Sequence, residues 1–335
     1  MKKLVLIDSN AIIHRAYHSI PKSFSNRKGE QTNAVYGFTT TLIRVLEDLN
    51  PDYIIASFDV GKVTFRTDQY AQYKAHRVAA DQELYDQIPR VKQLLSTLNI
   101  PICEKEGYEA DDCIGTIVSR IKEESKPQGA VQDDKELRQS GDIATFIVTG
   151  DKDLFQLLNG EIFVYWLKKG LSESAIVDSQ KIKDDFNLDP EDFIDLKALA
   201  GDSSDNIPGV PGIGPKTATT LLQKYDTLAN IYAQLETPQL VEAFDASARI
   251  KQLLIDNKDQ AFLSRSLATI HKEVPIEFDL EDAKWGSYDK AKLREFFEEM
   301  GFHSLLKRFG AEPREETKTK QAEEQKKKDE QLKLL

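Results

Sequence analysis

The sequence predicts an α/β fold in which a mostly parallel, doubly wound sheet is followed by a C-terminal helical domain. Short apolar runs have the length and composition of buried parallel strands, and they cover residues 4–7, 53–58, 100–103 and 144–148. Segments with apolar residues at helical spacing lie between them, at 35–49, 84–98 and 114–121. Strands and helices in alternation are typical of a doubly wound sheet.

The composition fits a globular protein of the cytoplasm. Of the 335 residues, 40% are hydrophobic and 30% are charged, and no stretch approaches the roughly 18 apolar residues that a membrane-spanning helix needs. The first apolar run ends in Asp8, which indicates a strand rather than a signal peptide. Cys103 and Cys113 are too few for a disulfide framework or a structural zinc site, and we expect both in the core.

The rest of the chain completes the domain prediction. The apolar segment 162–166 is expected to be an edge strand, and the polar residues 126–142 a surface loop. We predict an α/β core over 1–170 with a helical arch at about 60–90, and a helical domain over 171–311. The Lys/Glu/Gln-rich residues 312–335 are expected to form a flexible tail or linker, because they cannot bury enough apolar surface to fold alone.

Acidic residues follow each of the four predicted strands. Asp8 and Asp59 close the first two, and the later ones are Glu109, Asp111, Asp112, Asp151 and Asp153. Because the carboxyl ends of parallel strands share one edge, these side chains should converge on one crevice. Carboxylates crowded in this way need cations, and an all-oxygen set favours Mg²⁺ or Mn²⁺. Two such ions are suited to phosphodiester hydrolysis.

A structural alternative exists for the same acids. Residues 109–112 and 151–153 could cap helices and favour the helix dipole. Asp8 and Asp59 fit this alternative less well, because an ionised carboxylate directly after an apolar strand needs a partner. The coincidence of acids after all four strands favours a metal site.

A Gly/Pro-rich segment at 201–218 predicts a tight turn between two helices. Its glycines are Gly209, Gly212 and Gly214, and Pro215 suits the first turn of the next helix. Exposed N–H groups with Lys216 and Thr217 would bind phosphate without reading bases. Such turns often only connect helices, but this pattern matches the helix-hairpin-helix signature of DNA repair and replication proteins. Asp202 and Asp205, just before it, could reach the acidic crevice.

Residues 62–77 interleave cations with aromatic residues. Spacings of three or four place Arg66, Tyr70, Tyr73, Lys74 and Arg77 on one face of an expected helix. A solvated surface helix is the alternative. Next to Asp59 and the crevice, however, the cations could balance a scissile phosphate while the tyrosine rings stack on an unpaired base. Such local cations also reconcile nucleic-acid binding with the net charge of −11.

These motifs, in this order, resemble the 5′ nuclease family, which includes the 5′-3′ exonuclease domain of bacterial DNA polymerase I, phage 5′ exonucleases and flap endonucleases. The resemblance spans residues 1 to about 310. It is carried by Leu6-Ile-Asp8, Arg15-Ala-Tyr17, Phe58-Asp59, Thr64-Phe-Arg66, Tyr73-Lys-Ala-His-Arg77, Gly107-Tyr-Glu-Ala-Asp-Asp112, Thr149-Gly-Asp-Lys-Asp-Leu154 and the segment 201–209. It implies a PIN-like or resolvase-like core and a helix-hairpin-helix motif at 201–225.

The resemblance also implies roles for individual residues. Two Mg²⁺ ions, for which Mn²⁺ can substitute, would be held by Asp8, Asp59, Glu109, Asp111, Asp112, Asp151, Asp153, Asp202 and Asp205. Lys74 and Arg77, in a mobile arch, would act on the phosphate that is cut. DNA contacts would come from Arg15, Arg66, Tyr70, Tyr73, Gly209, Gly212, Gly214, Lys216 and Thr217. A K⁺ ion could bind backbone carbonyls at the helix-hairpin-helix turn.

The implied activity is that of a monomeric 5′-3′ exonuclease and flap endonuclease of replication and repair, acting at the bacterial nucleoid. Its partners would be DNA with a 5′ flap, a nick or a frayed end, including RNA primers, and a DNA polymerase that is either fused to it or separate. Two alternatives stay open, namely a non-catalytic module that binds branched DNA and a nuclease that prefers RNA. Cleavage assays with and without metal would distinguish the non-catalytic module from a nuclease. The turn at 209–218 favours DNA duplex over RNA as the substrate.

Overall fold

The computed structural model describes residues 1–61, 63–77, 79–124, 143–170 and 173–309. The predicted loop at 126–142 and the predicted tail at 312–335 lie outside these residues. One sheet forms the centre, with the strand order β3-β2-β1-β4-β5-β6. Its strands are β1 (Lys2–Asp8), β2 (Tyr53–Ser57), β3 (Ile102–Cys103), β4 (Ile143–Thr149), β5 (Ile162–Lys169) and β6 (Glu173–Val177).

The pairing of the strands confirms a mostly parallel, doubly wound sheet. β1 to β5 are parallel, and β6 pairs with β5 in the antiparallel direction. The prediction that 162–166 forms an edge strand was wrong, because β6 lies outside β5. β6 is short and partly exposed, so it lacks the apolar run that identified the other strands.

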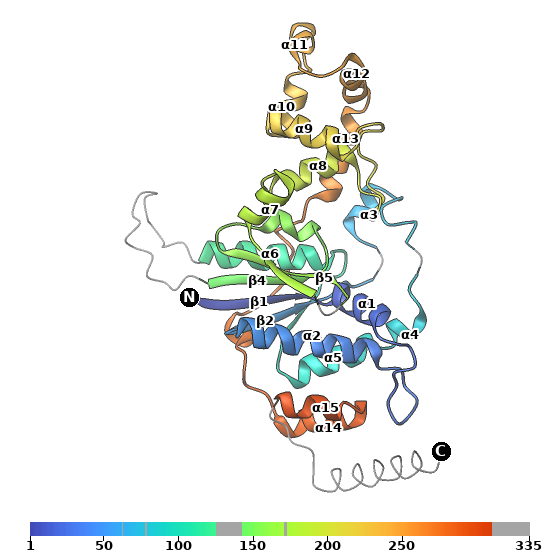
Figure 1. Ribbon diagram of the computed structural model, residues 1–335, viewed down its shortest axis with the longest axis vertical. Coiled ribbons are helices and arrows are strands. Elements are labelled where there is room, and N and C mark those ends of the chain that lie inside the picture. Colours follow the sequence, from blue (N-terminus) through green and yellow to red (C-terminus); the bar gives the residue numbers. More distant parts are fainter. Residues whose placement is uncertain (62, 78, 125–142, 171–172, 310–335) are drawn as a thin grey trace, which may run out of the picture.

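Helices cover both faces of the sheet, which explains why the strands are apolar throughout. α2 (Asn33–Leu49) and α5 (Ile88–Thr97) cover one face, and α6 (Ala110–Glu124) and α7 (Ser179–Phe186) the other (Figure 1). Along β1, Val5 and Ile7 pack with α2 and α5, whereas Leu4 and Leu6 pack with α6. Residues 84–98 form α4 (Gln82–Tyr85) and α5 instead of one helix, and Pro89 lies in the first turn of α5.

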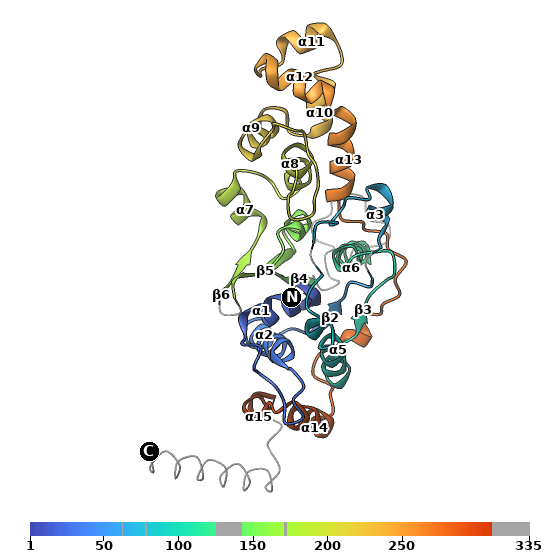
Figure 2. The ribbon, with the colours of Figure 1, turned by 90° about the vertical axis from the view of Figure 1, so that its right-hand side faces the viewer.

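A helical domain extends away from the sheet (Figures 1 and 2). It contains α8 (Asp192–Ala200), α9 (Pro215–Tyr225), α10 (Leu228–Ala233), α11 (Pro238–Ala243), α12 (Ala248–Asp256) and α13 (Lys258–Ala268). The chain then returns along α6, where Arg120 donates hydrogen bonds to the carbonyls of Val274 and Ile276. Earlier in this segment the His271 amide donates to Asp112, so the chain that leaves α13 also contacts the first turn of α6.

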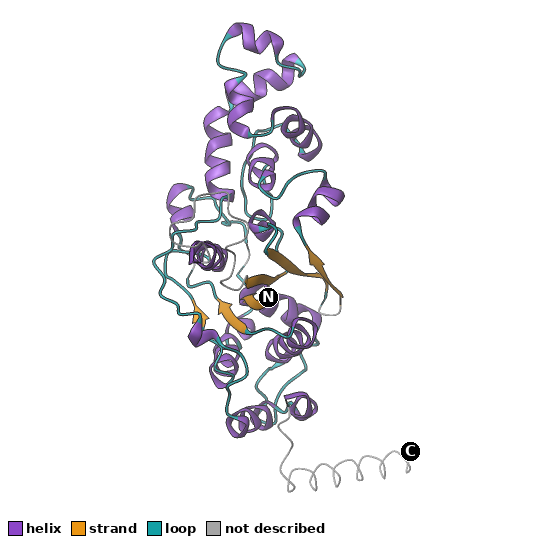
Figure 3. Cartoon of the chain, turned by 90° about the vertical axis from the view of Figure 1, so that its left-hand side faces the viewer, coloured by secondary structure: helices purple, strands orange, loops and turns teal. Residues whose placement is uncertain are grey.

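The C-terminal helices pack on the α/β core, not on the helical domain as the boundary of 171–311 implied. η2 (Glu281–Ala283) is followed by α14 (Lys290–Met300), α15 (His303–Leu306) and η3 (Lys307–Phe309). Leu293, Phe297 and Leu306 belong to the same buried cluster as α2 and α5. Figures 1 and 2 label α14 and α15 at the opposite end of the molecule from α11 and α12, and Figure 3 shows the same arrangement from the other side. None of the described helices has the length and apolar composition needed to cross a membrane.

Candidate active site

The acidic residues gather where the parallel strands end. Asp8 ends β1 and caps α1 (Ser9–Ser19), because its side chain accepts a hydrogen bond from the Ala11 amide at 3.2 Å. Thr149, at the end of β4, donates its hydroxyl to the other Asp8 oxygen at 2.6 Å. Asp8 is only 4% exposed. Burial, opposed by the Thr149 hydrogen bond and reinforced by the charges of Asp59 and Asp151, raises the pKa of Asp8 to about 7.

Asp111 and Asp153 lie in the same repulsive environment. Asp111 is in the first turn of α6, and burial together with the charges of Asp8 and Asp151 raises its pKa well above the usual range. Asp153 begins η1 (Asp153–Leu157), and burial and the charge of Asp151 raise its pKa to about 7. The ionised forms of these acids therefore destabilise one another, which is expected of carboxylates collected in one crevice.

The helical domain contributes Lys197 to this crevice. The ammonium group of Lys197, on α8, forms ion pairs with Asp153 and, at 2.5 Å, with Asp202. Burial opposes the charged amine, but these two carboxylates outweigh it and raise the pKa of Lys197. Burial also raises the pKa of Asp202, but Lys197 and Ser204 reverse this effect and lower it to about 2. Lys197 was not identified from the sequence; its only signal is its position in the last turn of a helix that leads into acids.

Asp112 is fully buried and forms a bidentate ion pair with Arg66. Both terminal nitrogens of Arg66 donate to Asp112 at 2.7 Å. Asp112 also accepts the backbone N–H groups of Glu109, at 3.1 Å, and of His271, at 2.8 Å. These four hydrogen bonds use the acceptor capacity of the carboxylate, so Asp112 cannot bind an ion in this arrangement. Arg66 is 2% exposed, so it offers no surface to DNA and instead joins α3 (Phe65–Gln69) to α6.

The predicted cationic residues reach the crevice, although not from one helix. Lys74 pairs with Glu109 at 2.9 Å and lies 3.6 Å from Asp205, and Arg77 pairs with Asp205 at 2.5 Å. The single helical face predicted for residues 66–77 was wrong. α3 ends at Gln69, Tyr70 is extended, and Lys74 has a φ of +53°, which interrupts any helix.

The predicted stacking of Tyr73 on a base does not fit this arrangement, whereas that of Tyr70 stays a prediction. Tyr73 is 3% exposed, and its hydroxyl lies 3.2 Å from carboxylate oxygens of both Glu109 and Asp205, to which it can donate. Tyr70 is half-buried against the cluster that contains Tyr73 and Leu267. The Tyr73 ring is therefore used in packing, and its hydroxyl positions two of the acids.

Asp59 is exposed and accepts the Ala110 amide at 2.8 Å, at the first residue of α6. Asp8 and Asp59 therefore fit the capping alternative better than the sequence suggested, because each accepts a backbone N–H group at the start of a helix. These hydrogen bonds position the carboxylates. They do not neutralise the carboxylates, so the charge of Asp59 still raises the pKa of Asp8.

The composition of the crevice fits a hard divalent cation, but the side-chain positions would have to change. Within the described ranges, no three His, Cys, Asp or Glu side chains are placed to hold a metal ion as they stand. Lys74, Lys197 and Arg66 contact many of the oxygens instead. Asp8, Asp111 and Asp151 form no ion pair with a described residue, and they supply the oxygen donors that Mg²⁺ and Mn²⁺ prefer.

The DNA contacts predicted at the turn between α8 and α9 are of two kinds. One residue packs inside the protein, and the others are exposed or half-buried. Gly209, at a φ of +60°, touches Gly201, since a Cβ there would lie 2.2 Å from the Gly201 nitrogen. Its N–H group donates to Ser264, so Gly209 is a packing position and not a phosphate contact. Gly212, Gly214 and Lys216 are exposed and Thr217 is half-buried. Gly214 caps α9 without a side chain, which leaves the amides of the first turn available to an anion.

Comparisons with known proteins cover almost the whole chain. The family model described as the 5′-3′ exonuclease N-terminal resolvase-like domain matches residues 3–187, and the one described as the 5′-3′ exonuclease C-terminal SAM fold matches residues 188–291. DNA polymerase I of Bacillus caldotenax is 36% identical over 317 residues, which are 95% of this chain and 33% of that protein. DNA polymerase I of Bacillus subtilis is 37% identical over 94% of this chain and 33% of that protein. The chain spans about a third of the length of these curated relatives.

Solved structures share the fold at low sequence identity. The bacteriophage T5 5′-exonuclease with bound divalent metal ions matches with a TM-score of 0.62 and 21% identity, over 80% of this chain and 89% of that chain. The catalytic core of Rad2 in complex with DNA substrate matches with a TM-score of 0.58 and 18% identity, over 90% of this chain and 88% of that chain.

Proposed function

The chain belongs to the 5′-3′ exonuclease family, and from this premise we propose that it hydrolyses DNA phosphodiesters at flaps, nicks and frayed 5′ ends with two Mg²⁺ ions. The observation that carries the proposal is the crowding of Asp8, Asp111, Asp151 and Asp153 at the carboxyl ends of β1 and β4 and the start of α6. Divalent ions bound there would activate a water molecule and stabilise charge on the phosphate.

The first role of the chain's own residues is to collect the carboxylates. Asp8, Asp111 and Asp151 are the central candidates for metal ligands, and Glu109, Asp153, Asp202 and Asp205 surround them with Lys74 and Lys197 as counter-charges. Asp112 is a weaker candidate, because its two oxygens already accept hydrogen bonds from Arg66 and from two backbone N–H groups, whereas Asp59 stays among the candidates. We propose that metal binding displaces the lysine ammonium groups and frees the surrounding acids.

The second role is to bind and orient the substrate. Lys74 and Arg77, released from Glu109 and Asp205, would bind the scissile phosphate, and the buried Arg66–Asp112 pair would keep the base of the arch in place. Lys216 and the exposed amides at the start of α9 would hold the backbone of the downstream duplex. A K⁺ ion at backbone carbonyls of that turn belongs to the same proposal. The chain would act as a monomer beside, or fused to, a DNA polymerase.

The test uses neutral replacements of the acids that have no cation partner. Asp111→Asn and Asp151→Asn should each abolish cleavage of a 5′-labelled flap duplex in Mg²⁺, because each removes a charged metal ligand. DNA binding in EDTA should survive or improve, because negative charge is lost near the phosphates. Asp279→Asn, an exposed acid next to η2, is the matched control and should cleave like the unmodified protein. Full cleavage in EDTA, or binding without cleavage in both Mg²⁺ and Mn²⁺, would overturn the proposal.

A further inference from the structure

Three cations lie beside the acids, at the ends of β4 and β5. Arg15 packs on Gly150, where a Cβ would come 2.4 Å from its guanidinium, and donates a 3.4 Å hydrogen bond to the carbonyl of Gly170. Gly150 and Gly170 directly follow β4 and β5, so Arg15 contacts the residues just after both strands. Burial alone lowers the pKa of Arg15, and among the described residues no carboxylate neutralises it.

Lys152 and Lys168 are held by aromatic rings and not by acids. Lys152 lies between Asp151 and Asp153 in the sequence, but its Nζ is 5.8 Å from the ring centre of Trp166 and 5.5 Å from that of Phe186. The Nζ of Lys168 is 5.6 Å from the same Trp166 ring. Aromatic faces attract ammonium groups without neutralising their charge. Both lysines are exposed, so two positive charges are presented at one indole.

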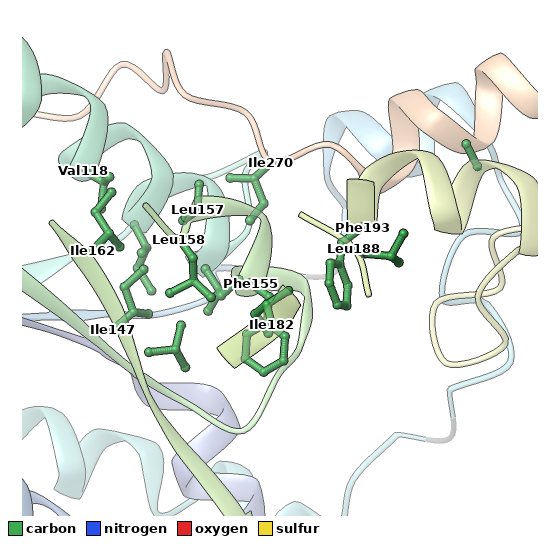
Figure 4. Close-up of a cluster of buried hydrophobic side chains, with 14 of the residues drawn as sticks. Val118, Ile147, Phe155, Leu157, Leu158, Ile162, Ile182, Leu188, Phe193 and Ile270 are labelled. Atoms are coloured by element: carbon green, nitrogen blue, oxygen red, sulfur yellow. The ribbon is translucent and has the colours of Figure 1, made fainter. Parts of the chain in front are cut away.

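The aromatic support is anchored in the core. Trp166 meets Phe155 edge to face at 5.5 Å, and Phe155 meets Phe193 at 5.9 Å. Phe155 and Phe193 belong to the buried cluster drawn in Figure 4. In the sheet register Trp166 pairs with Thr149, the last residue of β4 before Gly150 and Asp151. The half-buried Trp166 is therefore one strand away from the carboxylates.

Resting on the nuclease function proposed above, we propose that Arg15, Lys152, Trp166 and Lys168 form a binding site for the nucleic-acid backbone on the β5 side of the crevice. The acids of the crevice repel a polyanion, and cations on both sides offset that repulsion. Lys74 and Arg77 follow β2 in the chain and would offset the repulsion on the β2 side of the acids. The site around Trp166 is separated from them by β1 and β4, and its cations would offset the repulsion on the β5 side.

The primary test measures how salt weakens binding. A fluorescent 5′-flap duplex is titrated in EDTA at several salt concentrations with the unmodified protein, Lys152→Gln, Lys168→Gln and the double variant. Each lost phosphate contact should reduce the slope of log K against log salt by about 0.9, and the double variant by about twice that. Lys290→Gln, the same charge change on an exposed lysine of α14, should leave the slope unchanged.

A second readout does not depend on the lysine variants. The chain has two tryptophans, so Trp285→Phe leaves Trp166 as the only indole. Binding of the flap duplex should at least halve the quenching of Trp166 by acrylamide. An unchanged slope in the double variant, or unshielded Trp166, overturns the proposal. Absence of cleavage by the unmodified protein in Mg²⁺ would instead refute the nuclease function, and a reduced slope would still support the binding site.

Discussion

Replacing Asp112 with asparagine should destabilise the fold, whereas the same change at the neighbouring Asp111 should not. Asp112 is fully buried and accepts two hydrogen bonds from Arg66 and one each from the amides of Glu109 and His271. Asparagine has one acceptor oxygen, so its NH₂ group would face donors that it cannot satisfy. Arg66 would also lose most of its counter-charge while remaining buried.

The magnitude follows from these contacts. Removing one partner of a buried ion pair costs about 3–5 kcal/mol. Arg66 keeps hydrogen bonds to the carbonyls of Leu267 and Thr269, both at 2.9 Å, so we expect the lower end, about 3 kcal/mol. At Asp111, burial and the charges of Asp8 and Asp151 raise the pKa, because the fold disfavours the ionised side chain. A neutral Asp111→Asn side chain removes that repulsion, and the metal-free variant should be at least as stable as the unmodified protein.

Urea unfolding followed by circular dichroism at pH 7.5 in EDTA measures both free energies. Arg66→Met and the Arg66→Met, Asp112→Asn double variant complete a cycle that isolates the coupling between the two side chains. A strong negative coupling is expected, so that the double variant loses less stability than the sum of the single changes. Equal stabilities of Asp111→Asn and Asp112→Asn, within about 1 kcal/mol, would refute the assignment of Asp112 to structure and Asp111 to the metal site.

Three further predictions concern pH, the turn after α8 and Lys197. Because the pKa of Asp8 and of Asp153 is about 7 in the fold against 3.8 for an unperturbed carboxyl, these groups stabilise the metal-free protein most below about pH 4, and this contribution is lost as the pH rises to 7. Mg²⁺ competes with the same protons, so the rise in Tm on adding Mg²⁺ should be small at pH 5.5 and large at pH 8; a rise independent of pH would contradict the assignment. Gly209→Ala should lose about 2 kcal/mol or more in urea unfolding, because its Cβ would meet the Gly201 backbone, whereas Gly214→Ala, with no atom within 4 Å of the added Cβ, should lose less than about 1 kcal/mol. Lys197→Met removes the cation between Asp153 and Asp202, so its Tm in EDTA should fall and Mg²⁺ should raise it by more than in the unmodified protein; equal Mg²⁺ effects would argue against this role.

The sequence was sufficient to predict the convergence of the acids, because topology determines it. Once β1, β2 and β4 are parallel neighbours, the residues that follow them must lie at one edge. The turn between α8 and α9 was equally local, since Pro215 begins α9 and Gly209 and Gly212 have positive φ in the turn before it.

Side-chain burial could not be predicted, because it depends on contacts between distant segments. Arg66 and Tyr73 look like exposed members of a basic strip, but Arg66 hydrogen-bonds Leu267, 201 positions away, and Tyr73 contacts Asp205, 132 positions away. The packing of α14 and α15 on the α/β core could not be predicted for the same reason. Their apolar positions predict a buried helix face but do not identify α2 and α5 as the surface that they cover.

The proposed activity depends on divalent ions at Asp8, Asp111 and Asp151, and titration with Mn²⁺ followed by electron paramagnetic resonance tests this most directly. At pH 7.5 the unmodified protein should bind about two Mn²⁺ ions per chain, and Mg²⁺ should displace them. The Asp111→Asn, Asp151→Asn double variant should lose at least one of the two. Absence of bound Mn²⁺ in the unmodified protein, or the same number of ions in both proteins, would contradict the account.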